Sequence, residues 1–260
     1  MQAPSQEILL QADNVSKHYG DFIALGEVSL DLNSGELVSI VGPNGAGKTT
    51  LVNVLTALHQ PTKGIVKFAG QDIAGLDIVE LSTRGLARAF QLVHIFPDLT
   101  VRETLSVAAC SFLGLRWKMF GNVKRNSEVA DVVAHIAHAF DLTSALDSSS
   151  KSLSHGKRKL LDVASALALH PKVLILDEPT AGVSTADKHG IMETLLAAAQ
   201  AIGVQSIMLV EHDMDLVSRY SSRIIAMQGG NKIADLPTDD FFANEEAVSI
   251  VIGKGAAPCH

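Results

Sequence analysis

The sequence predicts an α/β protein with a mostly parallel sheet, and three observations support this. A continuous apolar run, LVSIV at 37–41, leads into the glycine-rich stretch GPNGAGKTT, and LVNVLTAL then continues at helical spacing. Helical and strand patterns alternate from residue 154 to residue 210. Hydrophobic residues make up 47% of the chain and aromatic residues only 5%. That balance is typical of an α/β core built from Ala, Val, Leu and Ile.

The elements expected before residue 100 surround the glycine-rich stretch. EILLQA near Glu7 and EVSLDL at 27–32 alternate between apolar and polar residues, which predicts half-buried antiparallel strands. The run at 37–41 predicts a buried strand, GIVKFAG from Gly64 predicts another strand, and residues 77–85 predict a short helix.

The elements expected after residue 100 begin with a helical block at 100–145. Its start is marked by a capping box, Thr100 with Glu103, and the segment GNVKRNSE interrupts it as a loop. The polar run at 147–152 is expected to form a flexible link. The elements predicted beyond it are a helix at 154–169, the strand KVLIL, a helix at 184–201 capped by Ser184 with Asp187, the strand VQSIMLV, and the hairpin RIIAMQGGNKIADL around a Gly-Gly turn.

Composition narrows the class of protein. The net charge is −7, whereas a nucleic-acid partner requires a basic surface, so none is expected. Cys110 and Cys259 lack ligand spacing, which favours a reducing compartment over a disulfide framework or a zinc site. The start MQAPSQEILL does not predict a secretory signal, and no run approaches about 18 apolar residues. We expect the chain to serve a membrane only through partners.

The stretch at 42–49 matches the phosphate-loop pattern G-x-x-x-x-G-K-[ST] between a predicted strand and a predicted helix. Glycines let successive backbone N–H groups turn toward a phosphate, and the helix start adds the positive end of its dipole. Lys48 would bridge the β- and γ-phosphates of ATP, and the Thr49 hydroxyl would bind Mg²⁺. An ordinary glycine turn is the alternative, which the strand–helix context disfavours. The expected nucleotide-binding residues here are Gly42, Pro43, Asn44, Gly45, Ala46, Gly47, Lys48, Thr49 and Thr50.

Two adjacent carboxylates, Asp177 and Glu178, end the apolar run VLIL. Their repulsion is costly unless a cation or a proton-transfer role offsets it. Asp177 is placed to hold the Mg²⁺ shell, and Glu178 to polarise the attacking water. A strand that ends in a solvated acidic turn is the alternative.

A second anion site is indicated by LSHGK at 153–157. Ser154 is a good helix N-cap and Gly156 permits a close backbone approach, so this helix start suits a γ-phosphate. One phosphate loop already surrounds the nucleotide on its own side. The second site is therefore best used on the nucleotide of a second copy, in a head-to-tail dimer that buries two ATP molecules.

Five motifs in order give the chain a resemblance that covers nearly its whole length: the phosphate loop, Gln91 in ARAFQ, LSHGK, LILDEP and EHD at 211–213. The chain resembles the ATP-binding subunits of ABC transporters. It looks most like those of branched-chain amino acid importers, with urea and short-amide importers close by.

The resemblance implies a P-loop NTPase (RecA-like) core with an N-terminal antiparallel β subdomain and an α-helical subdomain. Residues 1–91 and 161–237 would form the core, 92–160 the helical subdomain, and 238–260 a short C-terminal tail.

The resemblance also implies roles for single residues. Tyr19 would stack on adenine, although an interfacial strand aromatic is the alternative. Gln91 would reach Mg²⁺ and the attacking water, while His212 would contact the γ-phosphate and hold Glu178 and the water. Residues 92–99 would face the membrane subunit, although their apolar side chains could equally belong to a local core.

The implied partners are two integral-membrane permease subunits, a second ATPase subunit as heterodimer or homodimer partner, and indirectly a solute-binding protein. The chain would be cytoplasmic and peripheral on the inner face of the cell membrane. Its expected function is ATP hydrolysis that drives import of branched-chain amino acids or a related amide solute.

Three residues depart from the motifs of the family. His155 and Lys157 stand where the family's LSGGQ has glycine and glutamine, and Ser184 stands where many relatives have Asp. Lys157 either adds charge near the transferred phosphate or is a solvated helix residue.

A soluble ABC-type ATPase, for example an iron-sulfur assembly scaffold, is the main rival function. A small-molecule kinase is a second alternative, but it would leave LSHGK and Glu178 unexplained. His135 and His138, at i,i+3 spacing, lack a third metal ligand and favour a helix surface.

Overall fold

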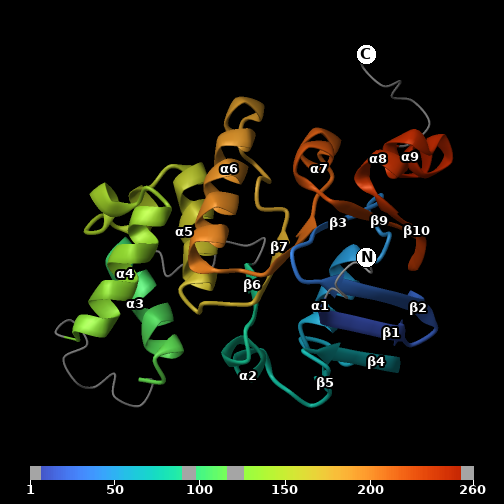
Figure 1. Cartoon of the computed structure of the whole chain (residues 1–260), viewed down its shortest axis with the longest axis horizontal. Coiled ribbons are helices and arrows are strands. Elements are labelled where there is room, and N and C mark those ends of the chain that lie inside the picture. The colour runs from blue at the N-terminus through green and yellow to red at the C-terminus, as the bar shows by residue number, and fades with distance from the viewer. Residues whose placement is uncertain (1–6, 90–97, 116–125, 253–260) are drawn as a thin grey trace, which may run out of the picture. The chain divides into compact units, whose positions relative to one another are not determined.

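A computed structural model describes residues 7–89, 98–115 and 126–252. The chain divides into two compact units (Figure 1). Unit 1 comprises Met1–Leu81 with Gln205–His260, and unit 2 comprises Ser82–Val204. These borders differ from the expected core, helical and tail boundaries, which stay a prediction. Within the described ranges, no helix is long and apolar enough to cross a bilayer.

Unit 1 begins with an antiparallel sheet in the order β2-β1-β4-β5. Its strands are β1 (Ile8–Tyr19), β2 (Phe22–Asn33), β4 (Lys63–Phe68) and β5 (Gln71–Asp72). The two predicted alternating strands are confirmed, and both are longer than expected. They extend because β1 and β2 pair from Ile8↔Asn33 to the turn at Tyr19↔Phe22, so ladder hydrogen bonds hold residues whose side chains follow no clear alternation.

The second set of unit 1 strands runs in the order β10-β9-β3-β8. The strands are β3 (Leu37–Val41), β8 (Ser206–Val210), β9 (Arg223–Gln228) and β10 (Asn231–Pro237). β3 is parallel to both β8 and β9, and β9 and β10 form the predicted antiparallel hairpin. The apolar runs of β3 and β8 are buried, as parallel strands covered on both faces require.

Helices complete unit 1. α1 (Lys48–Leu55) follows β3 and contacts β1 and β2. α7 (Met214–Tyr220) follows β8, and α8 (Thr238–Ala243) and α9 (Glu245–Ile252) end the described chain. The expected tail is therefore helical to residue 252. Phe241 of α8 is fully buried in one apolar cluster with Val41, Val217 and Ile224.

Unit 2 contains a parallel strand pair and a helical part. β6 (Leu86–Ala89) pairs with β7 (Val173–Asp177) in the register Leu86↔Val173. α2 (Ile78–Thr83) leads into β6 from the border with unit 1. The other helices are α3 (Val101–Phe112), α4 (Ser127–Ala139), α5 (His155–Leu167) and α6 (Thr185–Ile202), with short 3₁₀ turns at Thr143–Ala145 and Ser150–Ser152. α5 contacts α3, α4, α6 and β6, so it is the central helix of the unit. The α/β class predicted from the sequence is confirmed.

The polar run at 147–152 corrects one expectation, because it is not a flexible link. Ser149 forms a β-bridge with Thr100, and Ser150 is 1% exposed. The Ser150 hydroxyl donates to the Leu99 carbonyl oxygen at 2.9 Å. Serine hydroxyls can satisfy backbone groups locally, so a polar stretch need not be solvated. The short polar residues of this run therefore pack against the start of α3 and bond its backbone.

Two predicted helix starts have different outcomes. The Thr100–Glu103 capping box is present with both of its hydrogen bonds. At α6, the Ser184 hydroxyl donates to the Asp187 carboxylate at 2.6 Å and does not accept a backbone N–H group. The expected Ser184–Asp187 pair therefore forms between side chains, and the side-chain cap on the backbone is absent.

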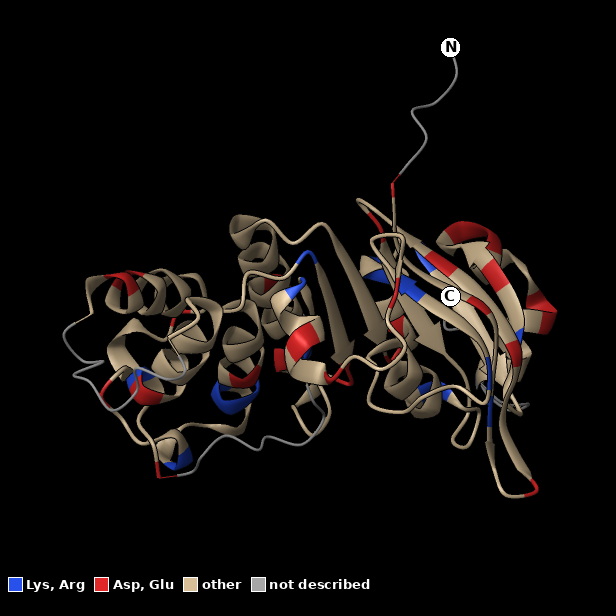
Figure 2. Ribbon diagram, turned by 90° about the horizontal axis from the view of Figure 1, so that it is seen from below, with Lys and Arg blue, Asp and Glu red and all other residues tan. Residues whose placement is uncertain are grey.

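Charged residues of both signs are scattered over the ribbons of each unit (Figure 2). Lys and Arg lie among Asp and Glu, in line with a net charge of −7 over the whole sequence. Anion binding in this protein must therefore come from local geometry and not from a basic surface.

Candidate nucleotide-binding and catalytic site

Glycines of the phosphate loop, residues 42–49, are required by backbone geometry in unit 1. Gly42 has φ 149°, and a Cβ there would lie 2.2 Å from the Met227 carbonyl oxygen. Gly47 has φ 98°, and a Cβ there would lie 2.8 Å from the Ala24 carbonyl oxygen. Side chains at these positions would force the loop away from its neighbours. An ordinary glycine turn does not require such close backbone neighbours, so these contacts disfavour that alternative.

The turn between β9 and β10 holds the phosphate loop from outside. The Gly230 N–H donates to the Ala46 carbonyl oxygen at 3.0 Å, and the Gly26 N–H donates to the Gly230 carbonyl oxygen at 2.9 Å. The loop is thereby hydrogen-bonded to Gly230 in this turn, and the turn is also bonded to Gly26 of β2. Preorganised backbone groups of this kind bind an anion without reorganisation at the moment of binding.

Lys48 places its charge inside the loop. Its Nζ donates to the carbonyl oxygens of Gly42 at 2.7 Å and Pro43 at 3.0 Å, and the residue is 8% exposed. α1 starts at this residue and has no acidic side chain in its first turn. Ammonium and helix dipole therefore act in the same direction, which favours a bound anion. Thr49 is exposed and Thr50 is half-buried.

Asp177 lies at the end of β7 in unit 2 and is 4% exposed. Its Oδ2 accepts from the Arg88 NH2 group at 2.6 Å, and the two side chains are 3% and 7% exposed. Arg88 lies on β6, opposite Ile175 in the register. A buried carboxylate needs such a charge-assisted partner. Sequence reasoning missed Arg88, and the available signal was one arginine inside the apolar run LARAF.

The predicted Mg²⁺ ligands carry oxygen atoms of the kind that this cation binds. Carboxylate and hydroxyl oxygens are the ligands that this cation prefers, and it binds nucleotide phosphates with only one or two protein ligands. Asp177 and Thr49 each supply such an oxygen from their own unit. Among the described residues, no three His, Cys, Asp or Glu side chains gather as a metal-binding group. His135 and His138 both lie on the exposed surface of α4.

Glu178 begins a turn at 178–183, here called the Glu178 turn. Its φ is +49°, a sparsely populated region for a residue with a side chain. The Ala181 N–H donates to the Glu178 carbonyl oxygen at 3.1 Å, and the Val183 N–H donates to the Thr180 carbonyl oxygen at 3.1 Å. Strained residues persist where the surroundings hold them, and they concentrate at functional sites. The Glu178 side chain is half-buried, and the turn holds the backbone from which it extends.

Residues 154–156, here called the α5 tip, start the central helix of unit 2. The Ser154 hydroxyl accepts from the Lys157 N–H at 3.3 Å, which confirms the predicted N-cap. As an acceptor in that bond, the hydroxyl keeps its own proton for another acceptor. A Cβ at Gly156 would lie 3.1 Å from Ile191 Cδ1 of α6, so helix packing also explains this glycine.

His212 follows β8 in unit 1, as predicted. Its side chain is 62% exposed, and its Nδ1 lies 3.8 Å from Glu211 Oε2. The Glu211 carboxylate is fully buried and accepts the His212 backbone N–H at 3.1 Å. The buried glutamate thereby fixes the backbone that presents the imidazole to solvent.

Tyr19 ends β1 and is 45% exposed. Its hydroxyl lies 2.8 Å from His59 Nδ1, and the two rings meet edge to face at 6.1 Å. Lys17 Nζ lies 5.3 Å from the ring centroid. These contacts fix the ring at the end of β1, and its adenine-stacking role stays a prediction.

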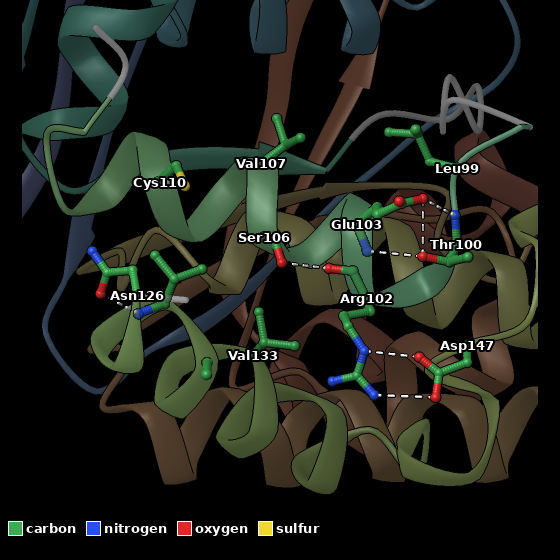
Figure 3. Close-up of a pocket in the computed structure, with 12 residues that line it drawn as sticks. Leu99, Thr100, Arg102, Glu103, Ser106, Val107, Cys110, Asn126, Val133 and Asp147 are labelled. Atoms are coloured by element: carbon green, nitrogen blue, oxygen red, sulfur yellow. Dashed lines mark hydrogen bonds and ion pairs between the residues drawn. The ribbon is translucent and has the colours of Figure 1, made fainter. Parts of the chain in front are cut away.

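Gln91 and most of the 92–99 segment lie outside the described residues. Leu99 lines a largely apolar groove of about 470 Å³ between α3 and α4 (Figure 3). Cys110, Asn126 and Val133 also line it, and burial raises the pKa of the Cys110 thiol. The groove has no glycine loop, so it differs in kind from the phosphate loop of unit 1.

Comparison with known proteins establishes the class. The family model described as ABC transporter matches residues 25–181. The chain is 30% identical to the high-affinity branched-chain amino acid transport ATP-binding protein BraF of Pseudomonas aeruginosa, over 95% of this chain and 98% of BraF. It is 33% identical to the probable branched-chain amino acid transport ATP-binding protein LivG of Archaeoglobus fulgidus, over 94% of this chain and 95% of LivG. The chain therefore belongs to the ABC transporter ATP-binding family.

Solved structures agree with this assignment. The ATP-binding cassette MJ1267 of an ABC transporter is 30% identical, with a TM-score of 0.82 and coverage of 95% of this chain and 99% of that one. Its ADP conformation gives a TM-score of 0.80 at 28% identity, over 95% and 99% of the two chains. This protein is thus an ABC-type ATPase that binds nucleotide, as the resemblance predicted.

Proposed function

We propose that this chain is the ATP-hydrolysing motor subunit of a membrane importer for branched-chain amino acids or a related small amide solute. One observation carries the proposal: the phosphate loop, with Lys48 inside it, stands in a chain that aligns over 94–95% of its length with two branched-chain amino acid transport ATP-binding proteins. Substrate choice is not carried by this subunit, so the solute follows from relatedness alone.

The proposed chemistry assigns each residue one task. The phosphate loop and Lys48 hold the β- and γ-phosphates, and Tyr19 stacks on adenine. Asp177, Thr49 and Gln91 would hold Mg²⁺, which would neutralise phosphate charge when bound. Glu178 accepts a proton from water as its oxygen attacks the γ-phosphorus, and the bond to the β,γ-bridging oxygen breaks to release ADP. His212 holds the water and Glu178 in line.

The proposed assembly is a head-to-tail dimer. The α5 tip, with Ser154 and Gly156, binds the γ-phosphate of the ATP held by a second copy or by a homologous ATPase subunit. Solved relatives support such a dimer, since the ATP-binding cassette MJ0796 is described as dimeric with ADP and Pi, at 26% identity and a TM-score of 0.73. Closure and reopening would drive two integral-membrane permease subunits at the inner face of the cell membrane, with a solute-binding protein outside.

The Glu178→Gln variant tests this function. With Mg²⁺ and ATP it is expected to accumulate a dimer on size-exclusion chromatography while hydrolysis falls about 10²-fold or more. The control, Glu246→Gln on α9, removes an exposed carboxylate and should hydrolyse ATP at the parent rate. A Glu178→Gln protein that turns over near the parent rate would remove Glu178 from its role.

The transport assignment needs a separate measurement. Cells that lack this gene are complemented with the parent or with Glu178→Gln, and uptake of labelled leucine, urea and a short amide is measured. Leucine uptake is expected with the parent only. Equal uptake of all three solutes in both strains would show that the chain serves no such importer, whatever its ATPase activity.

A further inference from the structure

His155 occupies a position where the family's usual signature has glycine, and it contacts the Glu178 turn. Its Nε2 lies 3.2 Å from the Ala181 carbonyl oxygen. A Cβ at Gly182 would lie 2.9 Å from the same nitrogen, and Gly182 has φ +76°. The imidazole therefore lies directly against the backbone of residues 181 and 182, and a side chain at Gly182 would displace it.

The chemistry of this contact fixes the ring. A carbonyl oxygen can only accept a hydrogen bond. Nε2 therefore carries a proton and donates a hydrogen bond to the Ala181 carbonyl oxygen. In the neutral ring Nδ1 is then the unprotonated nitrogen. The Ala181 N–H donates in turn to the Glu178 carbonyl oxygen. One residue, Ala181, therefore bonds both His155, through its carbonyl oxygen, and the backbone of the candidate base, through its N–H group.

The same histidine belongs to the α5 tip. It is the first residue of α5, directly after the Ser154 N-cap and before Gly156. Glu178 sits in a sparsely populated backbone conformation, which persists only where neighbouring contacts hold it. The bond from His155 holds this turn at Ala181, three residues after Glu178, and it comes from the helix start that carries the second anion site.

We propose that His155 is a positioning residue that couples the α5 tip to the Glu178 turn. This rests on the proposed function, because the tip acts on the nucleotide of a second copy. When the tip binds that phosphate, the His155–Ala181 hydrogen bond holds the Glu178 turn in the arrangement used for hydrolysis in its own chain. The two nucleotide sites of a dimer are thus linked through one side chain.

Two variants of His155 distinguish the effect of the hydrogen bond from the effect of the ring volume. His155→Gln keeps an N–H donor at a similar reach, whereas His155→Phe keeps the volume and removes the donor. Loss of one hydrogen bond predicts a fall in kcat of about five- to tenfold for His155→Phe. Affinity for a fluorescent ATP analogue without Mg²⁺ should stay within about twofold, because that binding belongs to the phosphate loop of unit 1. His155→Gln should restore kcat to within about twofold of the parent.

A spectroscopic measurement reads the bond itself. Two-bond ¹H–¹⁵N correlation on histidine-labelled protein, with the His155 signal assigned from its loss in His155→Gln, is expected to show the Nε2–H tautomer. The Nδ1–H tautomer would overturn the proposal. So would a His155→Phe protein with the parent kcat, or a His155→Gln protein as impaired as His155→Phe.

The dimer assay with Glu178→Gln accompanies these measurements. If that variant forms the ATP-dependent dimer while His155→Phe behaves as the parent, only the coupling is overturned. If no dimer forms with ATP, the proposed function fails first, and the tautomer measurement still decides whether the hydrogen bond exists.

Discussion

Replacing Arg88 with leucine is expected to cost far more stability than the same change at Arg102. Both arginines lie in unit 2 and bond a carboxylate, Arg88 to Asp177 at 2.6 Å and Arg102 to Asp147 at 2.8 Å. The first pair is 7% and 3% exposed, whereas the second is 48% and 82% exposed. The two pairs therefore differ in burial and hardly in chemistry or distance.

The expected loss of stability follows from the burial of the Arg88–Asp177 pair. Removing one member of a buried pair leaves the other as an uncompensated charge and typically costs about 3–5 kcal/mol. For a chain of this size that corresponds to a fall in Tm of about 6–20 °C. Water solvates both members of the Arg102–Asp147 pair, so Arg102→Leu should leave Tm close to the parent value. Arg88→Leu combined with Asp177→Asn should recover at least half of the loss, because the buried charge is gone.

Thermal unfolding followed by circular dichroism measures these differences. Nucleotide is left out, because a ligand that binds the folded state would mask the change. Equal Tm values for Arg88→Leu and Arg102→Leu would refute the reasoning. So would a double variant no more stable than Arg88→Leu alone, because the cost would then not arise from the unpaired carboxylate.

Three further predictions concern single positions. Gly42→Ala should abolish binding of a fluorescent ATP analogue, because its Cβ would meet a carbonyl oxygen at 2.2 Å, whereas Gly45→Ala, with open space around the Cβ, should keep measurable binding. Burial raises the pKa of Asp162 from 3.8 to about 7, so the protonated carboxyl contributes stability that is fully present below about pH 4 and is lost as pH rises through 7. Urea unfolding should therefore find Asp162→Asn more stable than the parent at pH 8 and alike at pH 4. Ser154→Ala should lose about 1 kcal/mol of stability through the missing N-cap, whereas Ser154→Asn should keep stability. Both variants lack the hydroxyl and should lose ATPase activity, so a Ser154→Asn protein with the parent activity would refute a hydroxyl contact.

Local sequence patterns predict the structure of a segment correctly where that structure depends only on neighbouring residues. The phosphate loop needs glycines at backbone angles that other residues resist, and a capping box needs only Thr100 and Glu103 three residues apart. The hairpin of β9 and β10 needs its Gly-Gly turn. Each of these signals lies within a few residues, so composition and spacing suffice to predict it.

Contacts between distant segments were not predictable in the same way. Arg88 and Asp177 are 89 residues apart, and only the parallel register of β6 and β7 brings them together. The run at 147–152 has the composition of a solvated linker, yet Ser150 is buried by a bond to Leu99, 51 residues earlier. Burial of a polar group depends on whether the fold supplies its partner.

The sequence by itself determined the α/β class, the nucleotide loop and the carboxylates that end β7, because strand, loop and helix each follow from the order of neighbouring residues. The tertiary structure alone decided which cation neutralises Asp177 and that His155 reaches the Ala181 carbonyl oxygen. Those pairings depend on strand register and helix packing. Both are set by burial of the whole core, and no short stretch of sequence records them.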